Sequence, residues 1–237
     1  MDLPAPLIPA VFLERPNRFL AIVRIGRRRC RAHMPNPGRM YELLRPGVQM
    51  FVARKTAPHR TTDYDVLMMR HRGRLVSLDS RAPNAIAREA IEARAVPALR
   101  PYRVARTEAT FGHSRLDLVL ERRRGRRAGS KQETMFLEVK SVTLVVGGHA
   151  MFPDAVTARG ARHMRELAEL RRSGYEAGVL FVIQRSDAES FGPHDEADPE
   201  FATALREAAA AGVRIWAHTC RVTQRSIRLS EAVPVQL

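Results

Sequence analysis

The sequence predicts an α/β (α+β) protein in which a small β-barrel precedes an α/β domain with a mixed sheet. Up to about Ser80, short apolar stretches alternate with Gly and Pro turns, as in a series of short strands. After Ser80, helical segments rich in Ala, Glu and Arg alternate with strands. Since 237 residues with 45% hydrophobic content can bury two modest cores, we expect one domain over residues 1–81 and another over 82–237.

The first domain is expected to contain five short strands. They cover residues 19–25, 29–34, 48–53, 64–70 and 75–78. Asn36-Pro37-Gly38 marks a loop, and residues 39–44 read as a short helical turn after it. Because five strands with an inserted helix are the OB architecture, we expect an OB-like barrel.

The second domain is expected to follow the order α-β-β-β-α-β-α-β. Its helices are predicted over residues 85–94, 157–172 and 200–211, and its strands over 103–109, 115–120, 134–139, 178–183 and 213–217. The strand 178–183 is apolar at almost every position, so it should be covered on both faces and have a parallel neighbour. The arginine-rich run 122–127 reads as an exposed hairpin loop.

The charge points to a polyanionic partner. Lys and Arg number 40 against 25 Asp and Glu, which gives a formal charge of +15. Nucleic acid is the favoured partner, and the alternative is that the basic surface only keeps the protein in solution. No GxxxxGK, HExxH or GxSxG pattern occurs, which argues against nucleotide hydrolases, zinc peptidases and serine hydrolases.

Cysteine usage and the first residues bear on the compartment. Cys30 and Cys220 lie far apart, so neither a disulfide framework nor a structural zinc is indicated, and a cytoplasmic location is expected. The prolines among the first ten residues interrupt the early apolar stretch, and we expect neither a signal peptide nor a membrane span. The sequence leaves the oligomeric state open, with a homodimer among the options.

Three polar residues on two predicted strands form the candidate catalytic site. Leu116, Leu118 and Leu120 should share one face of their strand, which leaves Asp117 on the other face. Glu138 and Lys140 share one face of the next strand, about 6.6 to 6.8 Å apart. If the two polar faces are aligned, Asp117, Glu138 and Lys140 converge.

Such a group is suited to metal-assisted hydrolysis. Two close carboxylates repel each other, and a hard divalent cation with oxygen ligands, Mg²⁺ or Mn²⁺, relieves that repulsion. Lys140 would orient water or neutralise charge in the transition state, and it is one of only three lysines in an arginine-rich chain. The alternative is that Glu138 and Lys140 form a solvent-facing pair, worth at most about 1 kcal/mol.

The order of elements around these residues resembles the PD-(D/E)xK nuclease core, which is also the core of restriction endonucleases. Five blocks of the chain further resemble the sugar fermentation stimulation protein A family: RPNRF at 15–19, MPNPGRM at 34–40, SRLD at 114–117, EVKSVTL at 138–144 and FPDAVTARG at 152–160. The resemblance implies an OB-like domain joined to a PD-(D/E)xK domain, with non-specific DNA binding. A catalytically silent DNA-binding or regulatory protein of sugar metabolism is the alternative to a metal-dependent nuclease.

Further residues are candidates for supporting roles. In the resembled nuclease core the first helix offers a carboxylate to the metal, which makes Glu89 a ligand candidate, although it reads equally as a solvated helix residue. Arg159 and His163 lie one helical turn apart and could face a phosphate, although we favour His163 as a capped surface residue. The other auxiliary candidates are Glu108, Thr157 and Gln184. The arginines expected to contact DNA are Arg39, Arg115, Arg122, Arg123, Arg124 and Arg159.

Two physical expectations follow from this reading. Replacing Asp117 or Glu138 by Ala should relieve carboxylate repulsion and leave the fold intact or slightly more stable. The two domains should be separable near residues 80–83, so limited proteolysis should cut there or in the arginine-rich run.

Overall fold

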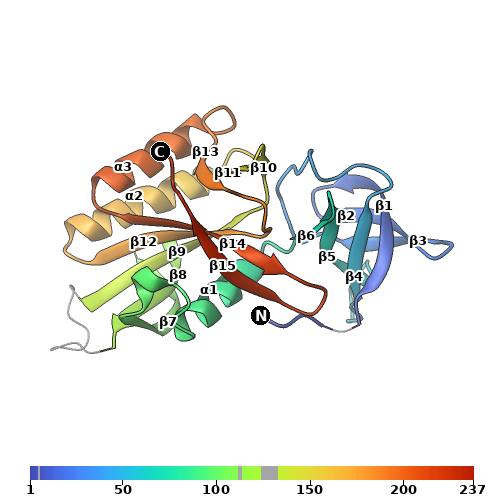
Figure 1. Cartoon of the computed structure of the whole chain (residues 1–237), viewed down its shortest axis with the longest axis horizontal. Coiled ribbons are helices and arrows are strands. Elements are labelled where there is room, and N and C mark those ends of the chain that lie inside the picture. The colour runs from blue at the N-terminus through green and yellow to red at the C-terminus, as the bar shows by residue number, and fades with distance from the viewer. Residues whose placement is uncertain (5, 112–113, 124–132) are drawn as a thin grey trace.

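The chain forms two domains that lie side by side in a computed structural model (Figure 1). The structure describes residues 1–4, 6–111, 114–123 and 133–237. The smaller β domain is built from the N-terminal part of the chain, and the larger domain has helices on both faces of a sheet (Figure 1). No helix among the described residues is long and apolar enough to cross a membrane.

The smaller domain is a closed barrel. Its strands are β1 (Ile8–Asn17), β2 (Leu20–Ile25), β3 (Arg28–His33), β4 (Gln49–Arg54), β5 (Tyr64–His71) and β6 (Arg74–Ser77). They pair in the order β3-β2-β1-β4-β5-β6, and the additional pairing of β3 with β5 closes the barrel. Leu44 N donates to Met40 O at 2.9 Å, which is the expected helical turn. The predicted OB-like barrel is confirmed.

The sequence reading missed the first strand of this barrel. β1 contains Pro9 and Pro16, which read as strand breakers. Its pairing with β2 also shifts register between Phe12 and Glu14 and again between Glu14 and Asn17. These irregularities break the alternation of apolar residues, so the period-2 signal was lost.

The larger domain contains the predicted order of elements with several additions. Its principal elements are α1 (Ala82–Glu92), β7 (Tyr102–Phe111), β8 (Ser114–Arg122), β9 (Thr134–Val142), α2 (Ala158–Arg172), β12 (Glu176–Ile183), α3 (Pro199–Ala210), β14 (Arg214–Val222) and β15 (Ile227–Val233). The sheet order is β15-β14-β12-β9-β8-β7, and β12 runs parallel to β9 and β14, so the sheet is mixed as predicted. The remaining elements are η1 (Pro97–Leu99), β10 (Val145–Val146), β11 (His149–Phe152) and β13 (Ser190–Pro193).

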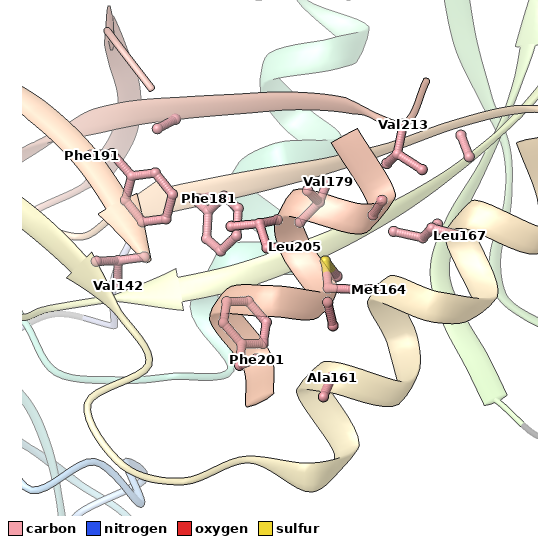
Figure 2. Packing of buried hydrophobic residues seen from close by; sticks show 14 of the residues in the cluster. Val142, Ala161, Met164, Leu167, Val179, Phe181, Phe191, Phe201, Leu205 and Val213 are labelled. Carbon is pink, nitrogen blue, oxygen red and sulfur yellow. The ribbon is translucent and has the colours of Figure 1, made fainter. Parts of the chain in front are cut away.

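Two apolar layers cover the faces of this sheet. The α2–α3 face packs Val179 and Phe181 of β12 against Met164 and Leu205 (Figure 2). The opposite face, which we call the α1 face, packs Leu180 and Val182 of β12 beneath α1. Because alternate residues of β12 enter different layers, the strand is apolar at nearly every position. Polar side chains that interrupt these two layers are therefore candidates for a site on this sheet.

The barrel is hydrogen-bonded to the larger domain at the junction between them. Ser77 N donates to Gln184 O at 2.9 Å, and the Ser77 hydroxyl donates to Gln184 Oε1 at 2.8 Å. Gln184 Nε2 donates in turn to Asp79 O at 3.1 Å. At the start of the chain, Leu3 N donates to Arg225 O at 2.8 Å, so the first residues contact the larger domain. The sequence reading had assigned residues 1–81 to the barrel.

Candidate functional site

Asp117 lies where strands β8 and β9 separate. The two strands pair from Glu121 opposite Thr134 to Leu118 opposite Leu137, and the same register would bring Asp117 opposite Glu138. The ladder ends at that point, and Asp117 Oδ2 instead accepts a hydrogen bond from Val139 N at 2.8 Å. Its Oδ1 accepts one from Asn84 Nδ2, in the first turn of α1, at 2.7 Å. The Asp117 carboxylate is thus fixed beside the backbone that carries Glu138.

The predicted alternation of β8 holds only in part. Leu118 and Leu120 pack on the α1 face as expected, but Leu116 joins the layer on the α2–α3 face. The regular alternation therefore fails beside Asp117, at the end of the ladder. This departure lets the Asp117 side chain reach between the two strands rather than standing on one face.

Glu138 and Lys140 point to the α2–α3 face of β9, with Phe136 and Val142 on either side of them. Glu138 is only 3% exposed, and its Oε1 accepts hydrogen bonds from Lys140 Nζ and from His163 Nδ1, both at 2.5 Å. Glu138 Oε2 is buried and has no hydrogen-bond partner among the described residues. The solvent-facing pair that served as the alternative reading is excluded by this burial.

His163 connects Glu138 to α2. Arg159 Nε donates to His163 Nε2 at 3.3 Å, so Nε2 is the accepting nitrogen and Nδ1 carries the proton that it donates to Glu138. His163 is 2% exposed, and the interpretation of this residue as a capped surface histidine is wrong. The Thr157 hydroxyl accepts from Gly160 N at 3.0 Å and caps the start of α2.

The two carboxylates differ in their protonation equilibria. Burial, followed by the negative charge of Glu138, raises the pKa of Asp117 above its ordinary value. Burial would also raise the pKa of Glu138, but the hydrogen bond from His163 and the charge of Lys140 outweigh it and lower that pKa. The carboxylate form of Glu138 is therefore favoured, while the ionised form of Asp117 is disfavoured.

These residues fit a hard divalent cation. An ionised carboxylate oxygen that is buried without a donor lacks the partner that such groups normally have. Each oxygen of Asp117 accepts one hydrogen bond and keeps a second lone pair. Among the described residues no cluster brings together three or more His, Cys, Asp or Glu side chains, so Asp117 and Glu138 would supply two ligands and other oxygen donors the rest.

Comparisons with known proteins agree with this architecture. A model of the sugar fermentation stimulation protein RE domain matches residues 81–226, and a model of the SfsA N-terminal OB domain matches residues 13–78. The chain belongs to the sugar fermentation stimulation protein family. It is 44% identical to the homolog of Moorella thermoacetica, with all of both chains covered, and 41% identical to that of Clostridium acetobutylicum, with 96% of each covered.

A solved structure of the SfsA family shares the whole fold. The SfsA of Pyrococcus furiosus in complex with Ca²⁺ is 33% identical to this chain and superposes with a TM-score of 0.88. The alignment covers 100% of this chain and 98% of the other. The predicted family and the two-domain fold are both confirmed.

Glu89 pairs away from Asp117, in contrast to the ligand role that the resemblance suggested. Its carboxylate pairs with the Met1 amino group and lies 3.7 Å from Arg228 Nη1. The α1 side chain that contacts Asp117 is Asn84 instead. Asn84 lies in the first turn of α1, beside the buried stripe that contains Ile86 and Ile91, whereas Glu89 lies off that stripe, so the apolar spacing argued against Glu89 as a ligand.

Glu108 and Gln184 also lie outside the carboxylate site. Glu108 forms an exposed pair with Arg115 at 3.5 Å on the edge of the sheet. Gln184 is fully buried and joins the barrel to Ser141, the residue after Lys140, at 3.0 Å. Gln184 therefore supports the domain junction rather than touching Glu138.

The arginines predicted to contact DNA are spread over the molecule. Arg159 is exposed beside His163, and Arg39 is exposed on the barrel loop. Arg122 stacks over Tyr102, with its Cζ 5.6 Å from the ring centre, and Arg123 Nε donates to Tyr102 O at 2.8 Å. Arg122 is the last residue of β8, five residues after Asp117, and Arg123 follows the strand. Arg124 lies outside the described residues.

Proposed function

We propose that this chain binds DNA and hydrolyses phosphodiester bonds with the help of Mg²⁺ or Mn²⁺. The observation that carries the proposal is Glu138, whose Oε2 is buried without a partner beside Asp117. The Ca²⁺ complex of the family member at 33% identity supports it, because Ca²⁺ and Mg²⁺ both prefer oxygen ligands.

Asp117 and Glu138 would hold the cation in this proposal. When bound, it would polarise a phosphate oxygen and activate water. His163 and Lys140 both hold Oε1 of Glu138, which leaves Oε2 as the free oxygen. Lys140 carries three donors and spends one on Glu138, so the others can orient a water molecule or contact a phosphate oxygen.

A catalytically silent DNA-binding or regulatory protein is the second candidate function. Both oxygens of Asp117 already accept hydrogen bonds, from Asn84 and from Val139 N, which a purely structural role would explain. The basic surface, with a formal charge of +15, supports DNA binding in either case.

The two functions are separated by one cleavage experiment. Single-stranded, duplex and branched DNA are incubated with the pure protein in Mg²⁺, in Mn²⁺ and in chelator. We expect cleavage that chelator stops and that Asp117→Asn abolishes, while Asp195→Asn, which changes an exposed carboxylate paired with Arg206, remains active. DNA binding without cleavage in either metal would reject the nuclease and favour the silent binding protein.

A further inference from the structure

A cleft of about 250 Å³ lies between the barrel and the larger domain. The barrel contributes Arg18 and the loop residues 36–38, and the larger domain contributes residues 141–144 and 151–157. The lining includes the apolar side chains of Val142, Leu144 and Phe152 and the charged side chains of Arg18 and Asp154. The cleft is therefore suited to a ligand with both apolar and charged parts.

The cleft adjoins the carboxylate site. Val142 lies two residues after Lys140 on the same face of β9, which corresponds to about 6.8 Å along the strand. Thr157, which also lines the cleft, caps the helix that carries His163. The lining of the cleft is therefore continuous in sequence with the strand and the helix that carry Lys140 and His163.

The barrel wall of the cleft is held rigidly. Arg15 donates to the carbonyl oxygens of Asn36 and Gly38, both at 2.7 Å, and to that of Arg18 at 2.8 Å. Asp154 Oδ2, from the larger domain, accepts a hydrogen bond from Met40 N at 2.7 Å. A side chain at position 38 would place its Cβ 2.8 Å from Asp154 Oδ2, so the close approach depends on Gly38. Contacts within the protein therefore fix this wall of the cleft.

Aromatic and basic side chains project from the two segments that Arg15 joins. Phe19 is 52% exposed and Tyr41 is 76% exposed, and no other aromatic side chain is among the strongly exposed large apolar residues of the described chain. Arg18 and Arg39, which lie close to these aromatic residues in sequence, are exposed as well, and Phe19 has one stacking neighbour on the protein, His33, at 6.5 Å between ring centres. We call these four residues, of which Arg18 lines the cleft itself, the aromatic rim.

We propose that the cleft and its aromatic rim bind a single strand of nucleic acid and lead it to the carboxylate site. Bases stack on Phe19 and Tyr41, and phosphates contact Arg18 and Arg39, which is the combination that binds single strands without regard to sequence. In a duplex the base faces are already stacked on one another, so they offer no free face to these rings. The inference rests on the proposed function, because it names the form of that substrate.

The test is binding measured by fluorescence anisotropy in chelator, so that no cleavage interferes. The probes are a short oligothymidylate, a short oligouridylate and a hairpin duplex. Because stacking contributes about 1 to 3 kcal/mol per base, we expect Phe19→Ala and Tyr41→Ala each to weaken single-strand binding about 5- to 150-fold. Duplex affinity should change far less, and Tyr41→Phe should bind like the parent protein.

The controls separate this proposal from misfolding and from the nuclease. Both rings are exposed, so the variants should melt like the parent, and Leu237→Ala removes an exposed apolar side chain outside the cleft lining. Unchanged oligothymidylate binding in the double variant of Phe19 and Tyr41 would overturn the proposal even if the protein cleaves duplex DNA. Ring-dependent binding without any cleavage would keep the proposal and reject the nuclease, and ring-dependent binding of oligouridylate would extend it to RNA.

Discussion

Glu138 stabilises the folded protein as a carboxylate, because its pKa is lowered by His163 and Lys140 in spite of burial. This contribution is present above the pKa of the unfolded state and is lost as the pH falls through the folded value. Glu138→Ala leaves two donors without their acceptor, so we expect a loss of about 3 kcal/mol at neutral pH. Urea unfolding measures it, and the difference from the parent should narrow in acid.

Asp117 is the control for this prediction because its pKa is shifted the other way. Burial and the charge of Glu138 raise the pKa of Asp117, so the protonated Asp117 carboxyl stabilises the fold below its unfolded pKa, and this contribution is lost as the pH rises through the folded value. Asp117→Asn should cost much less than Glu138→Ala at neutral pH. The sequence suggested that neither carboxylate is needed for stability, and for Glu138 we now expect the opposite. An equal loss of unfolding free energy in the two variants would contradict these different roles.

Lys140 supplies the second prediction for single residues. Its side chain is 13% exposed and its compact ammonium bonds to Glu138 Oε1, a contact for which a planar guanidinium is a poor substitute. We expect Lys140→Arg to lower the rate of the proposed cleavage about 100-fold or more while DNA affinity stays the same. Lys55→Arg, at an exposed lysine of the barrel, is the matched control. Equal cleavage rates for the two variants would remove Lys140 from the mechanism.

Among the secondary-structure elements, α2 connects the helical layer to the site. Thr157 caps its first turn, and replacing a capping threonine by alanine costs about 0.5 to 2 kcal/mol. Because α2 carries Arg159 and His163, which orient Glu138, we expect Thr157→Ala to lower both the melting temperature and metal affinity. Thermal unfolding and calorimetric Mg²⁺ titration measure the two effects, and Thr157→Ser should restore both.

Elements with a regular pattern could be predicted from sequence. The apolar stripe of α2 and the continuous run of β12 identified both, and period-2 alternation placed Glu138 and Lys140 on one face. β13 was missed because it is short and ends in Gly192-Pro193. β15 was missed too, since its burial varies irregularly along the strand.

Side chains that reach the site from helices were harder to predict than those on the strands. Asn84 borders the buried stripe of α1, and a local sequence pattern does not contain which strand residue meets that border. The burial of His163 could have been predicted, because this residue lies one turn after Gly160 and four residues before Leu167, on the buried stripe of α2.

In the whole molecule, the junction between the domains is part of the packed structure. Leu78 and Ala82 are buried, and Ser77 and Asp79 are hydrogen-bonded to Gln184. We therefore expect trypsin to spare Arg81 in the folded protein, in contrast to the cut near residues 80–83 that the sequence suggested. Mass spectrometry of the fragments checks this, with digestion in urea as the control in which Arg81 is cut. Early cleavage at Arg81 under native conditions would contradict it.

The proposed DNA binding should depend strongly on salt, because the chain carries a formal charge of +15. Each phosphate that is neutralised releases counterions, so the logarithm of the affinity should fall linearly with that of the salt concentration, with a slope of about −0.9 per contact on duplex DNA. Two unrelated duplexes should bind alike. A flat salt dependence, or a preference of about a hundredfold for one sequence, would reject electrostatic and sequence-independent binding.

Salt titrations of arginine variants identify which arginines contact phosphates. Arg39 is exposed on the barrel loop, whereas the guanidinium of Arg206 is neutralised by Asp195 at 2.6 and 2.9 Å. If Arg39 contacts a phosphate, Arg39→Ala should reduce the magnitude of the salt slope by about 1 and weaken all sequences equally. Arg206→Ala should leave the slope unchanged, because that charge already has a partner on the protein. Equal effects of the two substitutions would mean that net charge alone, rather than the surface around the barrel loop, directs binding.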